Sequence, residues 1–519
     1  MLSKSRILNA LQCARRAWLE THQPQLAVYD SATLAAFENG RRIGQLAIDL
    51  YGADGGTYVD YDGRDLAPAL AETDRLMSAQ RSGGAATPIF EATLQHEGVL
   101  VREDVLLPTA AGGWRVIEVK SSTRVKDVHV EDCAVQAWVH RGAGHRFDAI
   151  ALAHVNNQWV RPASIGSPAD DPGSYGGLLV EEDLTERVLD LQTSVPSWVE
   201  AARAAVEGPE PRVPVGHQCT QPFECPFMGH CWPGEDDTTY PVQGLGGRKD
   251  KLGKWIRAGY RDIRDVPPSA ISAEQQLRIR RVTASGEPEL LEGAKRFVDT
   301  LAYPRFYLDF EAVGPSIPLF PGTRPYQALP FQYSCHIERA PGVPRHRLQH
   351  REFLDLSPAS ASRAQGPMRA LAEALLRDLE EAGPVLMYSD YERKVINTLI
   401  ELLPDQDDPL ADALAALRDR LVDLLPVVKQ NYYHPAMLGS WSIKAVLPTL
   451  PAEPGARLDY RDLEGISEGM GAAEAYLEAI DPATTPERCA EIDRQLRAYC
   501  RRDTEAMVRL VGFLGSSET

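Results

Sequence analysis

Strand-like segments occur in two separate parts of this 519-residue chain, and a basic stretch of helical character lies between them. Apolar and polar residues alternate in short runs before residue 235 and again after residue 299, which is the period-two pattern of β-strands. A chain of this length is expected to form two or three domains. We therefore predict an α/β protein with domains at 1–238 and 299–519, joined by a basic helical linker at 239–298.

The composition is that of a folded protein, with 44% hydrophobic and 25% charged residues. No run of about eighteen apolar residues is present, so we expect no membrane span. The first residues carry charges between apolar positions, unlike a signal peptide. These features favour a cytoplasmic protein, in which the eight cysteines stay reduced and serve as metal ligands or buried residues rather than in disulfides.

The formal net charge of −18 argues against a protein that coats nucleic acid without specificity, because phosphate binding depends on Lys and Arg. One stretch offers a local contact. Between Arg248 and Arg281 there are ten Lys or Arg against four acids, with Trp255 and Tyr260 among them. A DNA-binding surface and a solvated helical face are equally compatible with this pattern.

The first domain shows the order strand, strand, helix, strand. Val99–Leu107 and Trp114–Lys120 are predicted to form a hairpin across a Gly-containing turn. A helix is expected from Val128 to Arg141, followed by an apolar strand over Phe147–Val155. This order predicts a small mixed sheet with a helix lying across it.

Charged residues on the predicted hairpin suggest a metal site. Asp104 lies on its first strand, and Glu118 and Lys120 stand two apart on the second, hence on one face. Two converging carboxylates suit a hard cation such as Mg²⁺ or Mn²⁺. A lysine beside the attacking water and the scissile phosphate would stabilise the developing charge. An exposed strand pair with charged residues is the alternative.

Together with Gln136 on the next helix, these segments resemble the PD-(D/E)XK nuclease superfamily in its RecB-like branch. The resemblance implies a restriction-endonuclease-like mixed sheet, metal ligation by Asp104 and Glu118, a catalytic Lys120 and a supporting Gln136. RecB-like members often carry a metal-binding His on the first helix, and the matching stretch 40–45 has none. Glu91 is either a substitute metal ligand or an exposed strand residue.

Three cysteines, Cys219, Cys225 and Cys231, follow one another with five residues between successive members, and Cys13 is the natural fourth. This split arrangement resembles the iron-sulfur nucleases, namely the AddB-type helicase-nucleases and the CRISPR-associated RecB-like exonucleases. The resemblance implies a 4Fe-4S cluster that joins the two ends of the domain. The spacing differs from theirs, so Zn²⁺ and unligated buried cysteines remain alternatives.

The second half opens and closes with paired functional residues. Asp309 and Glu311 share one face of a predicted strand, and Tyr499 and Asp503 lie four apart on a helix predicted from about 486 to 514. Two divalent ions about 4 Å apart need several carboxylates, and a hydroxyl group can orient the attacking water. The two segments therefore predict a second metal site.

A strand Asp-x-Glu with a later Tyr-x-x-x-Asp resembles the DEDDy branch of the RNase H-like 3'-5' exonucleases, which implies an RNase H-like α/β domain. The expected middle Asp is replaced here by Glu392, with Asp390 as the alternate. Asp423 is a further acid or a helix-start carboxylate, and Lys444 a candidate phosphate contact. The stretch 307–503 also resembles an uncharacterised bacterial domain family found fused to RecB-like nucleases.

The two resemblances imply a metal-dependent DNA nuclease with two active sites, acting on single strands or duplex ends in repair or in defence against foreign DNA. An RNA-directed 3'-5' exonuclease is the alternative enzyme. A nucleic-acid-binding scaffold with one inactive site is the alternative from another class. The expected partners are DNA and possibly RNA, and the sequence does not identify a protein partner.

Overall fold

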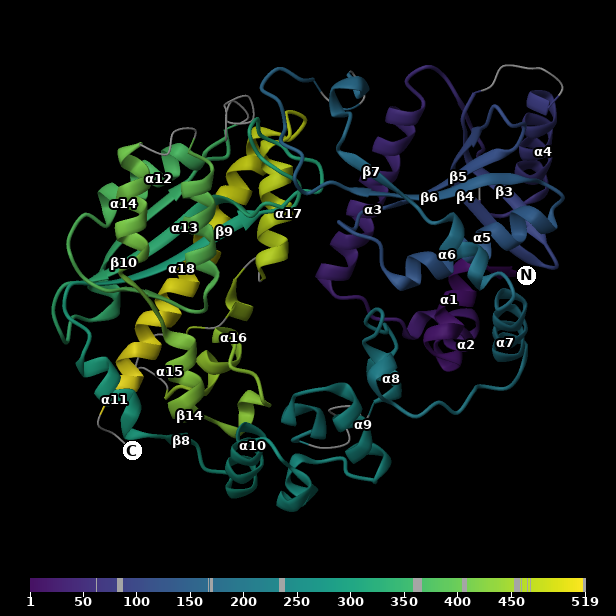
Figure 1. The fold of residues 1–519 in the computed structure, drawn as a ribbon. Helices are drawn as coiled ribbons and strands as arrows, with labels where there is room; N and C mark the ends of the chain where they lie inside the picture. The colour runs from purple at the N-terminus through teal and green to yellow at the C-terminus, as the bar shows by residue number, and fades with distance from the viewer. Residues whose placement is uncertain are drawn as a thin grey trace. The chain divides into compact units, whose positions relative to one another are not determined.

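The chain divides into two compact units. The N-terminal unit comprises Met1–Trp159 and Ser164–Trp232, and the C-terminal unit comprises Val160–Ala163 and the chain from Pro233 onward. Each unit contains its own mixed sheet (Figure 1). The computed structural model describes residues 1–61, 63–81, 87–166, 168, 171–232, 239–357, 366–403, 408–451, 458, 460–463, 465–466 and 468–516.

The N-terminal sheet has the strand order β2-β3-β4-β5-β6-β7, with β1 beside β4. Strands β3, β4 and β5 are antiparallel neighbours, and β6 runs parallel to β5. The predicted hairpin and the strand after the helix are confirmed. The strands are β1 Leu2–Ser3, β2 Thr57–Tyr58, β3 Ile89–His96, β4 Val99–Pro108, β5 Trp114–Lys120, β6 Phe147–Val155 and β7 Leu179–Asp183.

Helices cover both faces of this sheet. The predicted helix is α5, and its Val135 packs with Val101 and Val116 in one core. On the other face, Ile48 of α3 packs against Val105 and its neighbours. The helices are α1 Lys4–Gln12, α2 Ala14–His22, α3 Ser31–Tyr51, α4 Ala67–Arg81, α5 Asp127–Gly142, α6 Thr185–Leu191, α7 Val195–Glu207 and α8 Met228–Cys231.

Strands β3 and β4 are irregular near Glu91 and Asp104. Two pairs of residues at an odd spacing lie in the same core: Ile89 with Ala92, and Val101 with Leu106. Strict alternation would put residues at an odd spacing on opposite faces. Glu91 has a φ of 55° and lies in the irregular part of β3. Asp104 lies in the irregular part of β4. Sequence periodicity therefore does not predict where these two acids point.

The C-terminal sheet has the strand order β11-β10-β9-β12-β13. Strands β9, β10 and β11 form an antiparallel meander, and β12 and β13 run parallel to β9. The strand predicted to carry Asp309 and Glu311 is confirmed as β9. The strands are β9 Arg305–Val313, β10 Leu329–Glu338, β11 Gln349–Leu354, β12 Val385–Met387 and β13 Leu421–Asp423.

Helices α18 and α12 cover opposite faces of this sheet (Figure 1). Gln332 and Ser334 of β10 hydrogen-bond to α18, whereas Tyr333 between them donates to Asp378 of α12. Asp309 of β9 pairs in register with Ser334, on the α18 face. The helices are α12 Met368–Asp378, α13 Tyr391–Glu401, α14 Pro409–Arg418, α15 Leu424–Asn431, α16 Ile443–Val446, α17 Gly469–Ile480 and α18 Pro486–Gly515.

The segment expected as a linker is helical but belongs to the C-terminal unit. Its strand β8 (Glu289–Leu290) pairs with β14 (Tyr432–Tyr433), so the expectation of a strandless stretch was wrong. The buried side chains of Ala294 and Val298 lie on α11, which packs against α18. Burial of this apolar face favours attachment over a free link. The helices are α9 Lys249–Arg257, α10 Glu274–Ser285 and α11 Glu292–Asp299.

Several basic residues of this segment have structural partners. Arg278 and Arg281 both pair with Glu289. Arg280 donates to the carbonyl of Val266 at 2.7 Å, and Arg264 pairs with a neighbouring acid at 2.8 Å. These contacts favour a structural role for part of the basic stretch. Across the described ranges, no helix combines the length and the apolar character that a membrane crossing requires.

Candidate metal sites and cysteine centre

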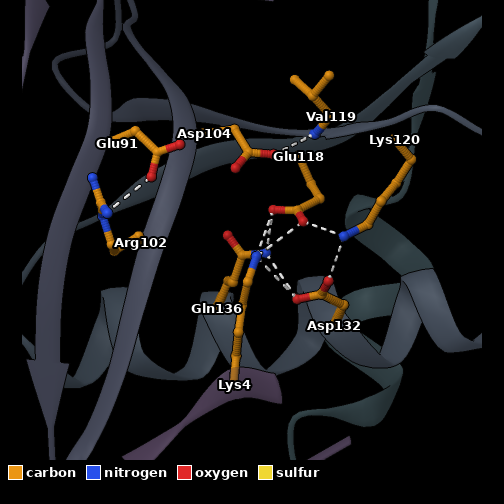
Figure 2. Close-up of polar contacts among 9 residues, drawn as sticks. All are labelled: Lys4, Glu91, Arg102, Asp104, Glu118, Val119, Lys120, Asp132 and Gln136. Carbon is orange, nitrogen blue, oxygen red and sulfur yellow. Dashed lines mark hydrogen bonds and ion pairs between the residues drawn. The ribbon is translucent and has the colours of Figure 1, made fainter. Parts of the chain in front are cut away.

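Glu118 forms the centre of the first candidate site (Figure 2). Its side chain is 2% exposed and lies on β5. Lys4 Nζ donates to both carboxylate oxygens at 2.9 Å, and Gln136 Nε2 donates to Oε2 at 2.6 Å. Lys120 also bonds to Glu118. The structure therefore brings together the predicted residues Glu118, Lys120 and Gln136. Lys4 joins them from a segment for which no role in the site was predicted.

Asp132 is a second carboxylate in this site that sequence reasoning missed. It is 4% exposed on α5, one turn before Gln136. Lys120 Nζ contacts it at 2.8 Å, Lys4 Nζ at 3.3 Å and Gln136 Nε2 at 3.1 Å. Burial acts to raise the pKa of Asp132, but the two ammonium groups hold it below its usual range. Its spacing of four from Gln136 on a predicted helix could have indicated it.

Asp104 lies beside this group. Its Oδ2 accepts the backbone N–H of Val119 at 2.7 Å. Burial, followed by the charge of Glu118, raises the pKa of Asp104 to about 8. Glu91 pairs with Arg102 at 3.1 Å, and burial raises its pKa. Asp104 and Glu91 line one surface groove together with residues of the 40–45 stretch on α3.

The carboxylates of the first site could bind a cation through their oxygens. In this structure, lysine ammonium groups contact most of these oxygens. Asp104 keeps a proton more readily than an ordinary Asp, and Glu118 accepts three side-chain donors. Divalent ions such as Mg²⁺ bind through one or two carboxylates and keep several waters. Asp104 and Glu118, with Glu91 nearby, provide the small number of carboxylates that such an ion binds.

Four acidic residues come together in the second candidate site: Asp309, Glu311, Glu392 and Asp503. They come from β9, from the first turn of α13 and from α18. Glu311, Glu392 and Asp503 are 8, 3 and 9% exposed. The four positions were predicted from sequence, and the fold brings them into mutual electrostatic contact.

Burial and mutual repulsion raise the pKa values in this group. Burial acts most strongly on each carboxyl, followed for Asp309 and Glu311 by the charge of Asp503. The pKa values of Asp309 and Glu311 lie well above the usual range, that of Glu392 is about 8 and that of Asp503 about 6. Buried like charges of this kind are relieved by a bound cation.

Cys500 is an unpredicted member of the second site. Its Sγ lies 3.4 Å from Asp309 Oδ2. In the part of the chain that the structure describes, Asp309, Glu311 and Cys500 form one group of metal-ligand atoms within 4.8 Å of one another. The sequence predicts no site role for Cys500, since nothing distinguishes it from a cysteine that is simply buried.

The geometry favours Glu392 over Asp390 as the third ligand. Glu392 Oε2 is buried and has no hydrogen-bond partner among the described residues. Asp390 is exposed and pairs with Arg393 at 3.2 Å. Asp423 accepts N–H groups from Ser389 and from the first turn of α15, so its helix-start interpretation is confirmed.

Two tyrosines and a lysine border the acids. Lys444 Nζ lies 5.1 Å from the ring centre of Tyr499 and 5.2 Å from that of Tyr460. Tyr460 Oη donates to Asp503 Oδ1. Tyr499 and Lys444 were candidates from sequence, whereas Tyr460 was missed because it lies in a segment without a regular pattern.

The four predicted cysteines line one pocket of the N-terminal unit: Cys13, Cys219, Cys225 and Cys231. Cys13 lies between α1 and α2, and the other three lie on one segment with α8. Cys225 N–H donates to the Cys219 carbonyl at 2.8 Å, which turns this segment back on itself. Burial raises the pKa of Cys225, and raises that of Cys231 to about 11, so a bound metal centre would displace their protons.

A comparison with protein families matches residues 306–442 to a domain of unknown function, DUF2779. The matched segment includes Asp309, Glu311 and Glu392 and ends before Tyr499 and Asp503. No curated protein matches the chain.

Proposed function

We propose that this chain is a metal-dependent nuclease with two carboxylate sites, one in each unit. The observation that carries the proposal is the second site, where buried carboxyls from β9, α13 and α18 lie together and raise one another's pKa values. Burying several like charges is unfavourable unless a cation compensates them. Two divalent ions held by such a set stabilise the attacking and leaving oxygens of a phosphodiester.

The fold of the C-terminal unit supports an RNase H-like interpretation. An antiparallel meander continued by two parallel strands fits that fold, and the two acids of β9 lie on the face covered by α18. Tyr499 is four residues before Asp503 on that helix and borders the acids. We propose that Tyr499 orients the attacking water and that Lys444 contacts a phosphate of the substrate.

The first site supports a second hydrolytic centre of the PD-(D/E)XK kind. Gln136 supports Glu118 as the resemblance implies, and the ammonium of Lys120 lies between Glu118 and Asp132. We propose that Asp104 and Glu118 hold Mg²⁺ or Mn²⁺, with Glu91 as a supplementary acid. In this proposal Lys120 stabilises the negative charge that develops on the scissile phosphate.

A groove of the N-terminal unit supports a nucleic-acid substrate. It leads to Lys120 and carries three exposed aromatic side chains, those of Tyr29, Phe37 and Phe223. Lys126 Nζ lies 5.8 Å from the ring centre of Phe223. Aromatic platforms beside basic groups bind single strands, because bases stack on the rings while cations contact phosphates. DNA is the substrate that we propose.

Truncation of the groove aromatics is expected to weaken single-strand binding. Tyr29→Ala and Phe37→Ala should each raise the Kd for a labelled oligonucleotide about tenfold, since one stacked base contributes roughly 1–3 kcal/mol. Fluorescence anisotropy at fixed ionic strength measures the effect. Leu189→Ala removes an apolar side chain of similar exposure elsewhere on this unit and serves as the control. Equal Kd values for the wild-type protein, the two aromatic variants and the control would contradict the assignment of this groove to single-strand binding.

The split arrangement of the four cysteines, which line one pocket, supports a 4Fe-4S cluster. Tetrahedral Zn²⁺ is the alternative centre for four thiolates. The proposed role of the cluster is to join α1 and α2 to the segment around α8.

Anaerobically purified protein is therefore expected to be brown and to contain iron. Cys225→Ser should lose the colour and most of the iron, because one of four thiolate ligands is removed. Cys489→Ser changes a half-buried cysteine of α18 in the other unit and should stay brown. Iron analysis and visible absorption measure both. A colourless wild-type protein with stoichiometric zinc would contradict the cluster assignment.

A nuclease assay tests the proposed function as a whole. The full chain is incubated with Mg²⁺ or Mn²⁺ and with labelled single- and double-stranded DNA and RNA. We expect cleavage of DNA that stops when EDTA removes the metal. Preferential cleavage of RNA would favour the alternative exonuclease, and binding without cleavage of any substrate would favour a scaffold.

A further inference from the structure

We propose that Lys4 is a positioning residue of the first site and that helix α1 couples it to the cysteine centre. This inference rests on the proposed function of the first site. Lys4 is the first residue of α1, and Cys13 directly follows the last. One short helix thus connects a side chain bound to Glu118 with one of the four cysteines.

The Lys4 end of α1 is fixed by charge. The ammonium contacts both oxygens of Glu118 and also Asp132, and the side chain is 18% exposed. Burial acts to lower the pKa of Lys4, but the two carboxylates keep it above its usual range. Removing either carboxylate would leave a largely buried ammonium without adequate compensation. Lys4 therefore holds Glu118 and Asp132 in a fixed relation.

The other end of α1 is fixed to the segment that carries three of the cysteines. Gln12 Nε2 donates to the carbonyls of Gln218 and Phe223, each at 2.7 Å. These two carbonyls lie directly before Cys219 and two residues before Cys225. The conformation of this segment therefore determines where the last turn of α1 is held.

Between its two ends α1 is short and well anchored. Nine helical residues span about 14 Å at 1.5 Å per residue. Ser3 caps the first turn, and Ile7 is fully buried. A helix held in this way moves as a unit. When the cysteine segment loses its order, α1 is released and Lys4 leaves Glu118.

Mn²⁺ binding without substrate tests this coupling in the full chain. All proteins carry Asp309→Asn, which weakens the second site, and calorimetry measures the remaining affinity. Lys4→Met removes a cation beside Glu118, so the affinity should rise about tenfold. Cys225→Ser should raise the Mn²⁺ affinity to a similar extent. In a protein that already carries Cys225→Ser, the further change Lys4→Met should alter this affinity less than twofold. Such non-additivity is the signature of coupled residues.

Arg6→Met is the matched control, because it removes a cation from the same helix whose side chain contacts the Met1 carbonyl instead. Its effect should add to that of Cys225→Ser. Additive effects of Lys4→Met and Cys225→Ser would overturn the coupling. Failure of the proposed site gives a different result, since Glu118→Gln would then leave Mn²⁺ binding unchanged.

Hydrogen exchange keeps the proposal testable if Cys225→Ser does not fold. Wild-type protein is compared with its cysteine centre loaded and after removal of the metal by a chelator. The amides of α1 should exchange at least about tenfold faster in the stripped protein. Unchanged protection of α1, with faster exchange confined to the segment around the cysteines, would overturn the proposal.

Discussion

Asp309→Asn is expected to lower the metal-dependent cleavage of the second site by at least about a hundredfold. Removal of groups that merely support a metal ligand already costs 10- to 100-fold, and Asp309 is a proposed ligand itself. The change keeps the shape of the side chain and removes one of several mutually repelling carboxyls. The folded protein should therefore become no less stable. Initial rates are measured in a Lys120→Met background, where the second site acts alone.

The neighbouring acids provide an internal comparison. Glu392→Gln should reduce the rate to a similar extent, because Glu392 is buried among the proposed ligands. Asp390→Asn, two residues earlier, should leave the rate within about twofold of the parent, because this exposed carboxylate pairs with Arg393 and is not a proposed ligand. A large loss in Asp390→Asn with none in Glu392→Gln would reverse the assignment of the third ligand.

Lys120→Met is expected to lower the cleavage rate of the first site by about a hundredfold to a thousandfold, the loss typical of removing one charge-stabilising donor. The rate is measured in an Asp309→Asn background, with Lys120→Arg as a conservative variant that keeps the charge. Substrate binding should change far less than the rate, because the proposed role of Lys120 lies in the transition state.

Arg124→Met removes a cation that is exposed on the loop directly after β5 and should leave the rate of the first site unchanged. If Lys120→Met leaves the cleavage rate unchanged, as Arg124→Met should, the first site contributes no catalysis. The chain would then be a nuclease with one active site and a second, binding unit.

Much of the fold could be predicted because its strands carry strong local patterns. The hairpin, β6, β9, β10 and α18 follow from apolar alternation and helical spacing. Strand β13 has only three residues and could not be distinguished from the helix that follows it. The attachment of residues 239–298 to the C-terminal unit depends on the pairing of β8 with β14, a contact between distant segments without a local signal.

The candidate sites show the same limit. The convergence of Glu118, Lys120 and Gln136 was implied by the resemblance of their segments to a known superfamily, and the structure places them within hydrogen-bond distance. Lys4 and Tyr460 reach the two sites from segments far from any motif. Their roles depend on how the chain packs, because a lone Lys or Tyr in a sequence has no preferred partner.

A crystal structure of the full chain soaked in Mn²⁺ tests the central claim most directly. We predict anomalous scattering peaks within 2.0–2.4 Å or so of carboxylate oxygens, the usual range for hard divalent cations. One set should lie among Asp309, Glu311, Glu392 and Asp503, and another between Asp104 and Glu118. A fully soaked crystal with no peak at either group of carboxylates would contradict the account.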